Sequence, residues 1–134
     1  MRLTKTIIAL TLVLAGVGFA HVVSGYITGV ADEGDVYIAM YVNDDYEREP
    51  DYGLVLPPDG AVNGRLAFRF DNVATDKYVM LVFQDTDGDG DLNLGMFGPT
   101  EPWGNYRRSR PFPNFGNMLF VVEGDVTDIE VDLD

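Results

Sequence analysis

The sequence predicts an all-β protein, an antiparallel β-sandwich of six to seven strands with an immunoglobulin-like or transthyretin-like plan. Short runs of alternating apolar and polar residues recur along the chain, which is the period of a half-buried strand. Glycine and aromatic residues are frequent, with 15 Gly, 7 Tyr and 8 Phe. Beyond residue 20, no segment has the long apolar stripe of an amphipathic helix.

Residues 1–20 have the pattern of an export signal. Arg2 and Lys5 precede the uncharged run Thr6–Ala20, and Gly18-Phe19-Ala20 offers small residues for cleavage. The apolar run is shorter than the roughly 20 residues that cross a membrane. We therefore expect a signal peptide over residues 1–20 and one domain over residues 21–134, exported to the periplasm or the medium and not membrane-bound after cleavage.

The first three strands follow from local patterns. Tyr26-Ile27-Thr28 is β-prone and ends at Gly29. The next segment places Val36, Ile38, Met40 and Val42 on one face and Tyr37, Ala39 and Tyr41 on the other. In the third, Leu66, Phe68 and Phe70 alternate with Arg65, Ala67 and Arg69. The expected strands are therefore Ser24–Val30, Asp35–Val42 and Arg65–Phe70.

Three more strands are expected in the second half. Lys77–Gln84 is nearly all apolar, which is typical of a central strand covered on both faces. Asn117–Glu123 and Thr127–Leu133 are expected as the last two strands, joined by residues 123–125. In the final segment apolar and acidic residues alternate, so we expect an antiparallel strand with one face in water.

Two segments between the expected strands are irregular. Asn43–Gly64 is acidic and contains three prolines, so it is predicted as a solvated loop. Asp85–Gly116 exceeds the length of most passive loops and is rich in aromatic residues. We therefore expect the second segment to carry the function.

The start of this second segment has the spacing of a calcium loop. Oxygen side chains occupy loop positions 1, 3, 5 and 9, the glycine of the sharp turn is at position 6, and position 7 would offer its carbonyl. Position 12, a bidentate Glu in an EF-hand, is Met96, and a strand precedes the loop. We therefore expect a weak Ca²⁺ site with Glu101 as an added ligand, or else a merely polar turn. The candidate ligands are Asp85, Asp87, Asp89, Asp91, Asn93 and Glu101.

The aromatic part of the same segment offers a second candidate site. Trp103 and Tyr106 could stack against a sugar or a peptide, and Arg107 and Arg108 could attract an anion. The simpler interpretation is a loop that folds its own aromatic residues over one end of the sandwich.

The order of these motifs resembles a bacterial family catalogued as domain of unknown function 2141. The resemblance rests on the strand 78–85, the acidic glycine loop, Gly98-Pro99-Thr100-Glu101 and Phe115-Gly116. It covers about residues 25–133 and implies an exported β-sandwich without an assigned function. The family pattern matches Asp85, Asp87, Asp89, Gly90, Leu92, Asn93 and Glu101. The sequence departs from the family pattern at Gln84, where the family often has His, at Asn93, where it has Asp, at Lys77, where it has Gly, and in the stretch Tyr106-Arg107-Arg108.

Composition excludes several classes of function. The net charge of −13 argues against nucleic-acid binding, and the absence of cysteine excludes disulfides and thiol chemistry. We expect an exported, non-catalytic binding or structural module whose Ca²⁺-type loop orders the long aromatic loop and presents it to an exported or cell-surface partner. The alternatives are a carbohydrate- or peptide-binding module without metal and a metal-assisted hydrolase that uses Asp85 and Glu101.

Overall fold

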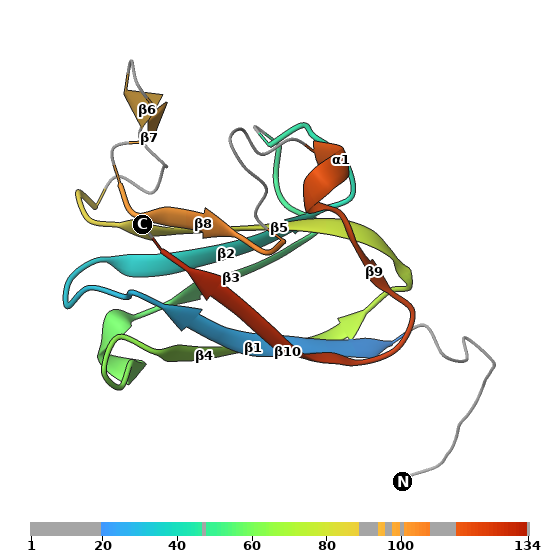
Figure 1. Ribbon diagram of the computed structural model, residues 1–134, viewed down its shortest axis with the longest axis horizontal. Helices are drawn as coiled ribbons and strands as arrows, with labels where there is room; N and C mark the ends of the chain where they lie inside the picture. Colours follow the sequence, from blue (N-terminus) through green and yellow to red (C-terminus); the bar gives the residue numbers. More distant parts are fainter. Residues whose placement is uncertain are drawn as a thin grey trace, which may run out of the picture.

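The computed structural model describes residues 20–46, 48–88, 94–95, 98–99, 101–107 and 115–133. Two β-sheets face each other and enclose the core (Figure 1). The smaller sheet has the order β10-β1-β4, with β1 (His21–Thr28), β4 (Leu66–Val73) and β10 (Val126–Asp132). The all-β sandwich predicted from the sequence is confirmed. The signal peptide was predicted over residues 1–20, of which residues 1–19 lie outside the described part.

The larger sheet has five strands and carries the candidate site. Its order is β3-β2-β5-β8, and β9 pairs with the other end of β5. A short hairpin, a 3₁₀ turn and one helical turn complete the described elements. The bounds are β2 (Asp35–Tyr41), β3 (Tyr52–Leu56), η1 (Pro58–Gly60), β5 (Asp76–Asp85), β6 (Leu94–Gly95), β7 (Gly98–Pro99), β8 (Trp103–Asn105), α1 (Phe115–Met118) and β9 (Phe120–Val122).

The alternation seen in the sequence decides which side chains enter the core. On β2, Val36, Ile38 and Met40 are almost completely buried between the sheets. On β5, Met80 and Val82 point the same way, so Leu81 and Phe83 face away from the core and are partly exposed. β5 is therefore central, as predicted, and residues 78–80 and 84–85 are buried on both faces, whereas Asp76 and Lys77 are exposed.

The direction of the last strand was predicted wrongly. β10 pairs parallel with β1, with Gly25 opposite Ile129 and Ile27 opposite Val131. The reason is that β9 belongs to the larger sheet and β10 to the smaller one, so the chain crosses between layers and approaches β1 from the same end. The expected half-exposed pattern is present, because Ile129 and Val131 are buried while their neighbours are exposed.

Besides the short hairpin of β6 and β7, two strands of the main sheets lie in segments that were expected to be irregular. β3 pairs with β2 inside the predicted solvated loop, and β8 pairs with β5 inside the long aromatic segment. Added to the six expected strands, they make the eight of the two main sheets. β3 and β8 are short and have weak local patterns, so pairing with a long neighbour stabilises them. The beginning of the expected strand Asn117–Glu123 is taken by α1. Within the described residues, no helix has the length and apolarity needed to cross a membrane.

Candidate metal centre

The candidate metal centre lies where β5 ends and β8 begins. Phe83 pairs with Trp103, and the backbone N–H of Gln84 donates to the carbonyl of Pro102 at 3.0 Å. One further step along this antiparallel register places Asp85 opposite Glu101. Sheet pairing therefore brings Glu101 to the acidic turn, across 16 positions of sequence.

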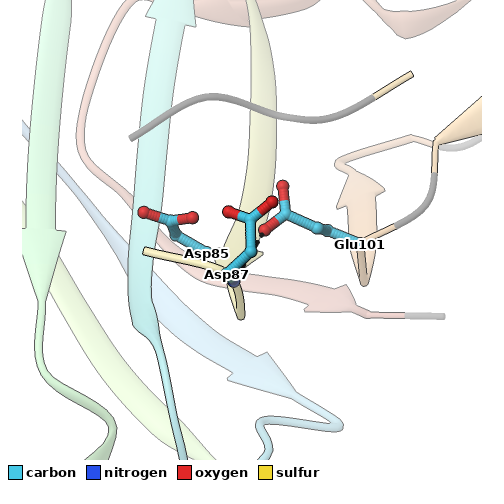
Figure 2. Close-up of side chains that lie close together, drawn as sticks. All are labelled: Asp85, Asp87 and Glu101. Atoms are coloured by element: carbon cyan, nitrogen blue, oxygen red, sulfur yellow. Dashed lines mark hydrogen bonds between the residues drawn. The ribbon is translucent and has the colours of Figure 1, made fainter. Parts of the chain in front are cut away.

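Three carboxylates converge at this point. One oxygen from each of Asp85, Asp87 and Glu101 lies within 4.8 Å of the others. Figure 2 shows the three side chains pointing to the same side of the turn. Asp85 is 6% exposed and Glu101 5% exposed, whereas Asp87 is exposed. Two of the three acids are therefore largely withdrawn from water.

Backbone N–H groups of the turn orient these acids. The N–H of Asp87 donates to Oε2 of Glu101 at 3.3 Å, and the N–H of Gly88 donates to Oδ1 of Asp85 at 3.1 Å. Gly88 has a φ of 77°, a conformation that a residue without a Cβ adopts at little cost. The sequence Asp-Thr-Asp-Gly therefore forms a tight turn whose own backbone holds two of the carboxylates.

The electrostatics of the cluster favour a bound cation. Two unit charges 4.8 Å apart repel by about 3 kcal/mol at an effective dielectric constant of about 20. Burial adds to this cost because it removes water from the charged oxygens. The backbone N–H groups of Asp87 and Gly88 reduce this cost. Carboxylate oxygens are the ligands that hard divalent cations prefer, so Asp85, Asp87 and Glu101 could hold such an ion.

Gln84 fixes the strand end that carries Asp85. Its side chain is fully buried, and its Oε1 accepts from the N–H of Ala31 at 2.8 Å. Its Nε2 donates to the carbonyls of Ala31 and Gly34, each at 2.9 Å. The amide thus ties β5 to the loop between β1 and β2. The family resemblance drew attention to position 84, and the structure gives this residue a positioning role.

Gly34 shows how closely that loop approaches the site. Its φ is 100°, and a Cβ placed on it would lie 2.5 Å from the carbonyl oxygen of Asp85. Only glycine fits both the conformation and the contact. The β1–β2 loop and the strand end are therefore packed backbone to backbone directly below the acids.

The remaining predicted residues are placed as follows. Trp103 lies on β8 beside Phe83 and is partly exposed. Tyr106 packs edge to face on Phe120 with ring centroids 5.1 Å apart, against the core. Arg107 is exposed and donates to the carbonyl of Leu119 at 2.7 Å. Trp103 and Tyr106 therefore do not share one face. Asp89, Asp91, Asn93 and Arg108 lie outside the described residues.

Two aromatic residues near the site were missed by the sequence analysis. The rings of Tyr37 and Phe83 stack with centroids 4.8 Å apart and an interplanar angle of 23°. The alternation of the sequence places Tyr37 on the second face of its strand, and this alternation was the signal that could have pointed to it. The sequence alone does not give the strand register, which places Tyr37 opposite Phe83 and Phe83 opposite Trp103.

Comparison with known proteins identifies the family. Residues 27–130 match a family described as an uncharacterized protein conserved in bacteria (DUF2141). The match spans most of the chain, so the chain belongs to this family, and the resemblance seen in the sequence is confirmed. No curated protein and no solved structure matches the chain significantly.

Proposed function

We propose that this family member is an exported, non-catalytic binding or structural module with a Ca²⁺ site formed by Asp85, Asp87 and Glu101. One observation carries the proposal: oxygens from two separate segments of the chain lie within 4.8 Å of one another. A cation bound there would tie the turn after β5 to the start of β8. The export part of the proposal rests on the signal pattern of residues 1–20.

Calcium is preferred over other cations because of the donor set. All three side chains offer oxygen only, and Ca²⁺ accepts six to eight oxygens in flexible geometry. Mg²⁺ demands a strict octahedron and keeps several waters, which suits fewer protein carboxylates. The loop spacing adds Asp89, Asp91 and Asn93 as further candidate ligands. Without a bidentate Glu at position 12, we expect a weak site with Kd of about 10⁻⁴–10⁻³ M.

A non-catalytic role is preferred over hydrolysis because the two buried acids have similar surroundings. A hydrolase with paired carboxylates needs one acid kept protonated and the other ionised, which requires different environments. Asp85 and Glu101 are exposed to nearly the same extent, 6% and 5%, and each accepts from a backbone N–H of the same turn. This symmetry favours shared coordination of one ion, which orders the adjoining segment for an exported or cell-surface partner.

Thermal unfolding in CaCl₂, MgCl₂ and EDTA tests the metal site. A ligand at a hundredfold excess over its Kd stabilises the native state by about 2.7 kcal/mol. For a domain of this size we expect Ca²⁺ at that excess, about 10–100 mM for the expected Kd, to raise the midpoint by roughly 10 °C over EDTA. Mg²⁺ is expected to raise it less. Equal midpoints in all three solutions would show that the cluster does not bind calcium.

A matched pair of variants locates the effect. Asp87→Asn removes one proposed ligand and is expected to abolish most of the Ca²⁺ shift while leaving the midpoint in EDTA nearly unchanged. Asp44→Asn removes an exposed acid from the β2–β3 loop and is expected to retain the full shift. If both variants lose the same part of the shift, Ca²⁺ acts on the overall negative charge and the site is wrongly placed.

A further inference from the structure

The two sides of the sandwich differ in how the end strands of the sheets are covered. On one side, β8 and β10 contact each other, and a Cβ on Gly104 of β8 would lie 2.4 Å from the carbonyl oxygen of Asp132 on β10. On the other side, the chain passes from β3 through η1 to β4 (Figure 1). Within the described residues, no further strand pairs with the outer edges of β3 and β4. We call these two strands the open edge.

β3 lacks the features that usually protect an edge strand. The unpaired N–H and C=O groups of such a strand can pair with another chain, so natural edges commonly carry charged residues or proline. β3 has the sequence Tyr-Gly-Leu-Val-Leu, with neither a charge nor a proline. The end strand β10, by contrast, has exposed acids at Asp128, Glu130 and Asp132. Of these two end strands, β3 is therefore the better suited to pair with a further strand.

Exposed apolar side chains gather along the same edge. Val55 on β3 is 55% exposed, and Val62, in the connection from β3 to β4, is 71% exposed. They are the two most exposed of the large hydrophobic residues in the described part of the chain. Covering them would remove apolar surface from water, which favours association.

The charge of the open edge suits an acidic partner. The whole chain has a net charge of −13, so most of its surfaces repel a second copy. Arg48 lies just before β3, Arg65 just before β4 and Arg69 on β4, and each forms an ion pair with a nearby acid. Positive charges thus accompany the acids here. A strongly basic partner would instead be attracted to the acidic turn after β5.

The open edge is also complementary to itself. A two-fold axis brings the same surface of two copies together and makes the paired strands antiparallel. On β4, this reversal brings Asp71 of one copy towards Arg69 of the other. On β3, an antiparallel pair centred on Leu54 places Val55 opposite Gly53, which has no side chain to obstruct the valine. A second copy of the chain therefore fits this edge.

We propose that the protein forms a dimer in which β3 pairs antiparallel with β3 of a second copy. The two larger sheets then join into one continuous sheet, and Val55 and Val62 lie at or beside the interface. The paired strands have only five residues each, which corresponds to a small interface. We therefore expect a weak dimer with a Kd of about 10⁻⁵–10⁻⁴ M. The proposal depends neither on the calcium site nor on export.

Sedimentation equilibrium of the purified protein in EDTA tests the dimer. Protein concentrations from about 1 µM to about 1 mM bracket the expected Kd. We expect the mass to rise from monomer to dimer, and the dimer to strengthen with NaCl because salt screens the repulsion between the copies. A monomer at every concentration would overturn the proposal. A dimer that forms in CaCl₂ and is absent in EDTA would also overturn it, because the acidic turn would then be the interface.

A matched pair of variants locates the interface. Val55→Lys places a charge on the open edge at an exposed position, and we expect at least tenfold weaker dimerisation. Val121→Lys changes a 49% exposed valine on β9 and is expected to dimerise normally. Equal weakening in both variants would overturn the assignment to β3. Unfolding midpoints of the two variants confirm that the compared proteins are folded.

Hydrogen exchange tests the same interface without a substitution. Pairing of β3 with a second copy protects its outward N–H groups, so residues 52–56 are expected to exchange more slowly at high protein concentration. Residues 126–132 of β10 should exchange at the same rate at low and high concentration. Protection that grows in β10 and not in β3 would show that the copies associate through the other side of the sandwich, and the proposal would be wrong.

Discussion

Two acidic turns at opposite ends of the larger sheet differ in the burial and the arrangement of their carboxylates. In the loop after β2, Oδ2 of Asp51 lies 2.7 Å from Nη2 of Arg48, and the same oxygen accepts from the N–H of Val42. Both side chains of the ion pair are about 30% exposed, at 32% and 29%. In the turn after β5, Asp85 and Glu101 are buried, and their oxygens lie close to each other and to Asp87.

The difference shows that the number of acids in a segment does not identify a site. The β2–β3 loop is rich in acids, yet an arginine within the loop accompanies one of them and hydrogen bonds hold it in place. The guanidinium of Arg48 hydrogen-bonds Asp51 and holds the pKa of that carboxyl below its usual value. The β5 turn instead gathers three carboxylates from two segments within 4.8 Å of one another, a donor set that a hard divalent cation can use.

The largest expected effect comes from the residue that fixes the β5 turn. Gln84→Leu keeps the volume but leaves the N–H of Ala31 and the carbonyls of Ala31 and Gly34 without their partner. We expect the free energy of unfolding to fall by about 4 kcal/mol, measured by urea denaturation. Asn43→Ala removes an exposed amide from the other turn and is expected to cost far less. If both variants lost the same free energy of unfolding, Gln84 would not hold the β5 turn more firmly than Asn43 holds the other turn.

A charge-removing variant of the β5 turn is expected to act in opposite directions with and without calcium. In EDTA, Glu101→Gln relieves repulsion with Asp85 and is expected to raise the free energy of unfolding by about 2 kcal/mol. In CaCl₂ at a hundredfold excess over the Kd, the unmodified protein gains about 2.7 kcal/mol, and the variant, which lacks a ligand, is expected to fall slightly below it. Glu123→Gln, at an exposed position, serves as the control and should change neither value. Destabilisation of Glu101→Gln in EDTA would show that protein groups already neutralise the cluster.

The smallest expected effect concerns the turn after β2. The pKa of Asp51 is lower in the folded state than in the unfolded chain, so its stabilisation is present above about pH 4 and is lost as pH falls through the folded value. Asp51→Asn is therefore expected to be slightly less stable than the unmodified protein at pH 7. The difference should disappear towards pH 2 in thermal scans. A difference that persists at that pH would mean that the carboxyl stabilises the loop without its charge.

Local patterns predicted most of the fold but not the partners of its shorter strands. Leu66, Phe68 and Phe70 alternate so clearly that β4 and its inward face follow from the sequence. β8 has three residues, Trp103, Gly104 and Asn105, and no pattern of its own. It forms because β5 offers hydrogen bonds along one edge. The parallel pairing of β10 with β1 likewise depends on which layer the chain enters after β9.

The sequence by itself determined the chemistry of the candidate site. Asp85 and Asp87 are two residues apart in a glycine turn, so their proximity is a local property of the backbone, readable from spacing alone. Only the tertiary structure decided that Glu101 lies against them, that Gln84 holds the strand end, and that Tyr37 and Phe83 extend from Trp103 towards β3. The physical reason is that these contacts depend on strand register, which arises from burial of side chains distant in sequence.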